Sequence, residues 1–127
     1  MSSDQNIASS EIRAFVRGEL GRQDLEKLGI EIREIEGGYE FANHQHIVAK
    51  VSLRDVAQGL LRFRYDPEAM RYWAGLVVAG SSFIEFGPDF EELPDGEVLL
   101  DALWDAWFRQ DIAEDAFVRA ECLLKLS

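Results

Sequence analysis

Residues 30–41 read Ile-Glu-Ile-Arg-Glu-Ile-Glu-Gly-Gly-Tyr-Glu-Phe, and this stretch decides the fold class. Apolar and charged side chains alternate strictly at the start of Ile30–Ile35, which is the pattern of a half-buried strand. Gly37-Gly38 follows, and Tyr39-Glu40-Phe41 is a second short extended run. Two extended runs on either side of a Gly-Gly pair predict an antiparallel β-hairpin.

The next run, Ile47–Val51, is rich in β-branched residues and is expected to be a third strand. Residues 30–51 should therefore form a small antiparallel hairpin or a three-stranded sheet. Before and after them, apolar residues recur at helical spacing, which predicts five or six helices. The expected fold is α+β and mostly helical, in a single domain over residues 1–127.

Short capping signals predict where these helices begin, because Ser and Asp side chains accept hydrogen bonds from the first free backbone N–H groups. The residues 89–96 are expected to be an acidic loop with Pro94 as a breaker, followed by a helix over Glu97–Arg109. The other predicted starts are Ser9 or Ser10, Ser52 with Asp55, Asp66 with Pro67, and Asp111 with Glu114.

The negative charge of the chain is concentrated in its last third. Residues 1–84 carry 12 acidic and 10 basic residues, whereas residues 85–127 carry 12 acidic and only 3 basic residues. Charge of one sign steers a basic partner toward the surface that bears it. A pI near 4.5 argues against sequence-independent nucleic-acid binding and against docking on an anionic membrane.

Other features point to a cytoplasmic protein. Cys122 is the single cysteine, so no internal disulfide can form. The first residues lack the basic and apolar regions of a secretory signal, and no apolar run approaches the length of a membrane span.

The helix predicted over Glu97–Arg109 carries an unusual polar face. Its apolar face, expected in the core, contains Leu99, Leu100, Leu103 and Trp107. The acidic residues recur at i, i+4 and i+8, although like charges at this spacing destabilise an isolated helix by about 0.2–0.5 kcal/mol per pair. Two aromatic residues fall within or beside this row. We call the set the acidic aromatic stripe: Glu97, Asp101, Trp104, Asp105 and Phe108.

Two interpretations of the stripe are open. Most aromatic residues in a small domain belong to the core, so Trp104 and Phe108 would be buried beneath the acidic loop or the last helix. Alternatively, the aromatic residues anchor a partner while the carboxylates around them steer it. The acidic residues of the preceding loop would extend the acidic field: Asp89, Glu91 and Glu92. The two interpretations predict opposite exposures for Trp104.

Other interpretations belong to different classes of function. His44 and His46, with Glu40, would form a metal site of a small metalloprotein or enzyme, but two histidines two residues apart are more often solvated loop residues. A homodimer would bring the acidic stripe against its own copy, which like charges oppose. The expectation is therefore a non-enzymatic protein with no metal and no cofactor. Four arginines give the middle of the chain a basic side: Arg54, Arg62, Arg64 and Arg71. They are most simply solvated helix charges, some of them paired with nearby acids; the alternative is that they repel a basic partner and so orient it.

Three segments carry a resemblance to a known kind of protein: Val51-Ser52-Leu53-Arg54-Asp55-Val56 with Leu60-Leu61, then Trp73-Ala74, then Asp101-Ala102-Leu103-Trp104. Over residues 51–110 the chain resembles small acidic bacterial immunity proteins of contact-dependent and other polymorphic toxin systems. The resemblance implies a protein that binds a basic toxin domain, commonly a nuclease, and covers its active site. It implies no catalytic residues.

Overall fold

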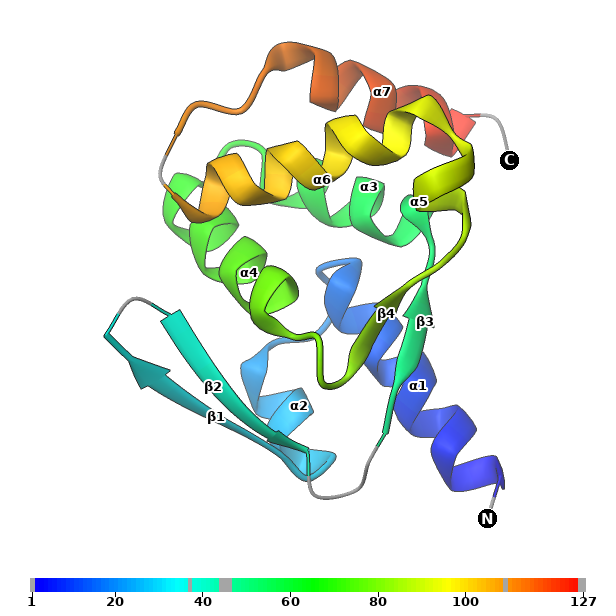
Figure 1. The fold of residues 1–127 in the computed structure, drawn as a ribbon, viewed down its shortest axis with the longest axis vertical. Helices are drawn as coiled ribbons and strands as arrows, with labels where there is room; N and C mark the ends of the chain where they lie inside the picture. The colour runs from blue at the N-terminus through cyan, green and yellow to red at the C-terminus, as the bar shows by residue number, and fades with distance from the viewer. Residues whose placement is uncertain (1, 37, 44–46, 109, 126–127) are drawn as a thin grey trace.

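The computed structural model of the chain describes residues 2–36, 38–43, 47–108 and 110–125. Over these residues the fold is α+β and mostly helical, with seven helices, one antiparallel hairpin and one short parallel strand pair (Figure 1). The helices are α1 (Ser2–Val16), α2 (Arg22–Lys27), α3 (Leu53–Arg62), α4 (Pro67–Ala79), α5 (Asp89–Glu92), α6 (Pro94–Trp107) and α7 (Glu114–Lys125). The strands are β1 (Ile30–Ile35), β2 (Gly38–Asn43), β3 (Ala49–Val51) and β4 (Ile84–Phe86).

The predicted hairpin is confirmed: β1 and β2 pair antiparallel, from Ile30 opposite Asn43 to Ile35 opposite Gly38. The third strand also forms, but it does not join the hairpin. Instead, β3 pairs parallel with β4, and Ala49 lies opposite Ile84. The three-stranded alternative was therefore wrong.

Asn43 explains why the chain leaves the hairpin at this point. Its side-chain amide donates to the carbonyl oxygens of Ile47, at 2.6 Å, and of Ser82, at 2.9 Å. Its side-chain oxygen accepts from the Ile47 N–H at 3.2 Å. The end of β2 is thereby tied to the segments that lead into β3 and β4. Ala49 and Val51 are completely buried, and β3 packs against α1.

Helices α3 and α4 begin at the predicted N-caps, Ser52 and Asp66. Ser52 and Asp55 form a reciprocal capping box, and the Asp66 carboxylate accepts from the Ala69 N–H while Pro67 occupies the first turn of α4. Two other predicted starts were wrong. Helix α1 begins at Ser2, upstream of Ser9 and Ser10, and α7 begins at Glu114, three residues after Asp111.

The predicted acidic loop is instead helical. Residues Asp89–Glu92 form α5, and α6 begins at Pro94 rather than at Glu97. Proline suits the first helical turn because its missing N–H would have no partner there. Gly96 allows this turn to pack closely on the backbone of Phe90, where a Cβ atom would overlap. Pro94 therefore begins a helix and is not a breaker within a loop.

Buried residues of the helices and of β1, β3 and β4 form one hydrophobic core. Helix α4 packs against α6 and against β2, while α3 packs against α7 (Figure 1). No helix among the described residues combines the length and the apolar character needed to cross a bilayer.

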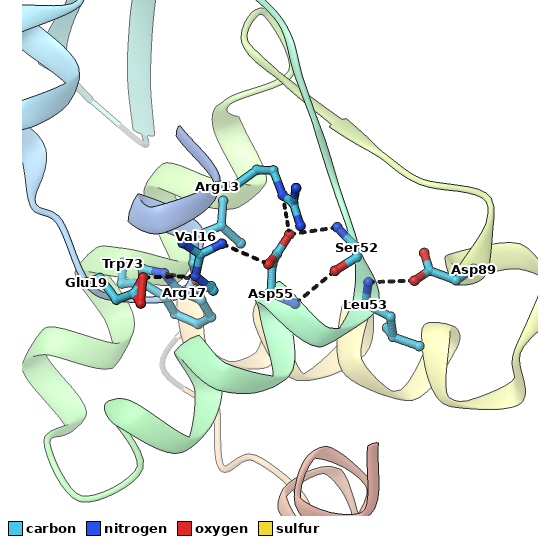
Figure 2. Close-up of polar contacts among 9 residues, drawn as sticks. All are labelled: Arg13, Val16, Arg17, Glu19, Ser52, Leu53, Asp55, Trp73 and Asp89. Atoms are coloured by element: carbon cyan, nitrogen blue, oxygen red, sulfur yellow. Dashed lines mark hydrogen bonds and ion pairs between the residues drawn. The ribbon is translucent and has the colours of Figure 1, made fainter. Parts of the chain in front are cut away.

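A buried carboxylate joins α1 to α3 in this core. Asp55 is only 4% exposed. It accepts from Arg13 Nε at 3.1 Å, from Arg17 at 3.3 Å and from the Ser52 N–H at 2.9 Å (Figure 2). Burial alone would raise the pKa of Asp55, but these hydrogen bonds and the arginine charges outweigh it and hold that pKa below its usual range.

Candidate partner-binding surface

Helix α6 presents the acidic aromatic stripe to solvent, and its other side enters the core. Leu99 and Leu103 are completely buried, as predicted, whereas Leu100 and Trp107 are half-buried. Glu97 and Asp101 are exposed, and Asp105 is half-buried. The helical period therefore placed the apolar and acidic faces correctly.

The two aromatic residues of the stripe are exposed, contrary to the interpretation that places them in the core. Trp104 is 48% exposed and Phe108 is 60% exposed. They lie one helical turn apart, and their rings stack with centroids 5.7 Å apart and planes within 12°. Stacking orders both rings into one apolar ridge. An ordered aromatic ridge among carboxylates has the composition of an interface anchor.

The carboxylates around the ridge fall into two groups. Glu91, Glu92, Glu97 and Asp101 are exposed and form no ion pair with a described residue, so their charge faces solvent. Asp89 differs, because it is half-buried and accepts from the Leu53 N–H at 2.9 Å, across from α5 to the start of α3 (Figure 2). The Asp89 side chain thus makes a structural contact that no local sequence pattern indicates.

A groove lies beside Phe108, between the end of α6 and the tip of the hairpin. Its volume is about 380 Å³. Ile35 on its rim is 44% exposed. The residues that line this groove are Glu34, Ile35, Gly38, Tyr39, Arg71, Trp107 and Phe108.

Aromatic packing forms the wall of the groove. The rings of Tyr39 and Trp107 have centroids 5.3 Å apart, and Tyr72 meets Tyr39 edge-on at 6.0 Å. The Arg71 guanidinium lies 5.5 Å from the centre of the Trp107 ring. Burial, with Tyr72 and Glu34 nearby, raises the pKa of Tyr39 above its ordinary value.

Sequence reasoning missed this groove, because three separate elements form it. One signal was available: Gly75 stands within the apolar face of α4, where glycine weakens a helix. A Cβ atom at this position would overlap the Trp107 ring. The glycine therefore indicates a close approach of another element.

The alternative site at His44 and His46 lies outside the described residues. Glu40, its third proposed member, is exposed, and its carboxylate lies 3.7 Å from Arg33. Within the described ranges, no group of three or more His, Cys, Asp or Glu residues is placed to hold a metal ion. Cys122 is exposed.

Comparison with protein-family models, with curated proteins and with solved structures gave no match to this chain. The resemblance to immunity proteins therefore stays a prediction.

Proposed function

We propose that this chain is a non-enzymatic binding protein whose acidic aromatic stripe docks on a basic protein partner. The observation that carries the proposal is the exposed, stacked pair of Trp104 and Phe108. Burying both rings against a partner would contribute several kcal/mol, since one large apolar side chain is worth about 1.5–3 kcal/mol.

The charge distribution supports a basic partner. Glu97 and Asp101 flank the ridge without ion pairs among the described residues, and Glu91 and Glu92 extend the same sign along α5. Unpaired surface charges accelerate the association of an oppositely charged partner more than they tighten the complex. An immunity protein that neutralises a basic toxin domain, such as a nuclease, is the class that we propose.

Photo-crosslinking tests the surface before any partner is known. A photoreactive phenylalanine at position 108 should capture a specific protein in cells of the source organism, and the same group at Tyr65 is the control. Tyr65 is also an exposed aromatic residue, but it lies outside the stripe. Equal capture from the two positions would contradict the assignment.

The captured protein, once purified, allows a quantitative test. Trp104→Ala should weaken its binding by about 2 kcal/mol or more, as at an interface hot spot, while Tyr65→Ala should leave binding unchanged. Asp101→Lys with Glu97→Lys should slow association and reduce its dependence on salt. Unchanged binding of these variants would exclude the stripe.

The class and the oligomeric state have their own tests. An immunity protein is expected to have a toxin gene beside its own gene and to abolish the activity of that toxin when the two proteins are mixed.

Sedimentation at low and high salt should show a monomer at both salt concentrations, because a dimer through the ridge would oppose like charges. If the wild type were a dimer and Phe108→Ala a monomer, the ridge would be assigned to self-association instead.

A further inference from the structure

Arg71 occupies an unusual position in the groove beside the ridge. Its Nε atom is buried and has no hydrogen-bond partner among the described residues. Its guanidinium lies over the Trp107 ring. Arg71 also lines a second cleft, of about 500 Å³, together with Met70 and Phe117 and with two acidic residues that the structure also describes, Glu68 and Asp111, neither of which forms an ion pair with it. The Arg71 side chain thus borders two clefts.

The other half-buried arginines that the structure describes have carboxylate partners. Arg17, Arg22, Arg64 and Arg119 each form an ion pair within the described residues. Arg54 and Arg62 are exposed, so water can solvate them. A buried N–H without an acceptor costs about 1–3 kcal/mol, but a ligand cannot reach the buried Nε. The terminal nitrogens of the guanidinium are not buried and also have no hydrogen-bond partner among the described residues, so they are the donors open to a ligand.

We propose that the groove is a subsite for one aspartate or glutamate side chain of the protein partner, with an apolar residue beside it. This inference rests on the proposed function. A guanidinium fits a carboxylate with two parallel hydrogen bonds. The apolar neighbour would pack on Ile35 and Phe108, which are both exposed at the rim of the groove.

The charge of the groove narrows the occupant to a single carboxylate. Glu34 on the hairpin wall adds a negative charge to the same groove, which disfavours a polyanion. The partner surface would therefore be basic opposite Glu97 and Asp101 and would carry one acid opposite Arg71, which fixes its orientation.

Short peptides test the subsite without the natural partner. We would titrate ¹⁵N-labelled protein with Ac-Leu-Glu-Leu-NH₂ and follow the Arg71 Nε–H and Trp107 indole N–H resonances. Both should shift in a saturable way. The glutamine analogue Ac-Leu-Gln-Leu-NH₂ should bind at least about tenfold more weakly, since a charge-assisted hydrogen bond is lost. Equal binding of the two peptides, or no shift at about 10 mM peptide, would overturn the proposal.

Variants of Arg71 and a third peptide complete the test of the subsite. Arg71→Gln should abolish the preference for glutamate, and Arg54→Gln, an exposed arginine, should retain it. Arg71→Lys, which keeps the charge without the planar fork, should weaken the preference and serves if Arg71→Gln does not fold. If Ac-Leu-Gln-Leu with a free carboxyl terminus bound more strongly than Ac-Leu-Glu-Leu-NH₂, the assignment of a side-chain carboxylate would be overturned. Trp104 takes no part in this titration, so failure of the titration would remove the subsite and leave the Trp104→Ala binding test of the ridge unaffected.

Discussion

The backbone of Gly75 in α4 lies directly against the indole ring of Trp107 in α6. A Cβ atom at position 75 would overlap Cε3 and Cζ3 of the indole and would lie 3.1 Å from the Tyr39 ring. Tyr39 in turn packs on Trp107. This close approach joins α4, α6 and the hairpin, and it builds the wall of the groove beside Phe108.

Gly75→Ala should therefore destabilise the protein. Alanine favours a helix over glycine by up to about 1 kcal/mol, but the overlap with a rigid ring should cost about 1–3 kcal/mol and shift Trp107. Urea unfolding would measure the net loss. Gly21→Ala is the control, because a Cβ atom there would meet no atom within 4 Å. A variant at position 75 more stable than wild type would contradict the close approach.

Asp55 should make stability depend on pH in the acid range. Its folded-state pKa lies below the ordinary 3.8, so the folded protein binds fewer protons than the unfolded chain between the two values. The contribution is complete above about pH 5 and is lost as pH falls through the folded-state pKa. Urea midpoints measured from pH 7 downward should fall more steeply for wild type than for Asp55→Asn.

At pH 7, Asp55→Asn should cost about 2 kcal/mol, because it breaks a buried ion pair whose arginine partners remain partly solvated. Glu26→Gln removes the exposed carboxylate of the Arg22–Glu26 pair and is the matched control. Such pairs contribute at most about 1 kcal/mol. If Asp55→Asn and Glu26→Gln lowered the free energy of unfolding equally, burial of Asp55 would not strengthen its contribution to stability.

The structure shows which parts of the fold local sequence could predict. The starts of α3 and α4 were predicted because a cap such as Ser52 or Asp66 acts on N–H groups two or three residues away. The partner of β3 was not, because β4 lies more than 30 residues downstream and the hydrogen bonds of Asn43 that separate β3 from the hairpin reach as far as Ser82. No local pattern contains that information.

The candidate site divides in the same way. The helical period placed Glu97 and Asp101 on one face, because the angle around a helix follows from residue spacing alone. The period could not decide whether Trp104 is exposed, since exposure depends on which other elements cover that face. The sequence does not distinguish Arg71 from the other arginines, because its position at the border of two clefts depends on the packing of α4, α6 and the hairpin.

Arg64 should hold α7 against the rest of the protein. It pairs with Glu114 and with Glu121, and its guanidinium lies 4.8 Å from the centre of the Phe117 ring. Arg64→Ala should cost about 1–2 kcal/mol through the combined loss of these contacts. Hydrogen exchange should accelerate in α7 and not in α4, whereas the exposed Arg62→Ala should change neither. Uniform acceleration along the chain would contradict this local role.

The stability of tryptophan variants should separate the binding surface from the core. Trp73 is 3% exposed, and its indole N–H donates to the Val16 carbonyl at 3.1 Å (Figure 2). Trp73→Ala should therefore cost about 3–5 kcal/mol. Trp104→Ala should cost less than about 1 kcal/mol, because about half of that residue already lies in water and its ring stacks on the exposed Phe108 ring.

Urea unfolding of the two variants at one pH would measure both losses. A residue that contributes little to stability yet exposes a large apolar ring is explained by binding rather than by folding. If Trp104→Ala proved as destabilising as Trp73→Ala, the ring would belong to the core and the stripe would lose its anchor. If it proved harmless to stability and also left capture of the crosslinked partner unchanged, the ridge would not be the docking surface.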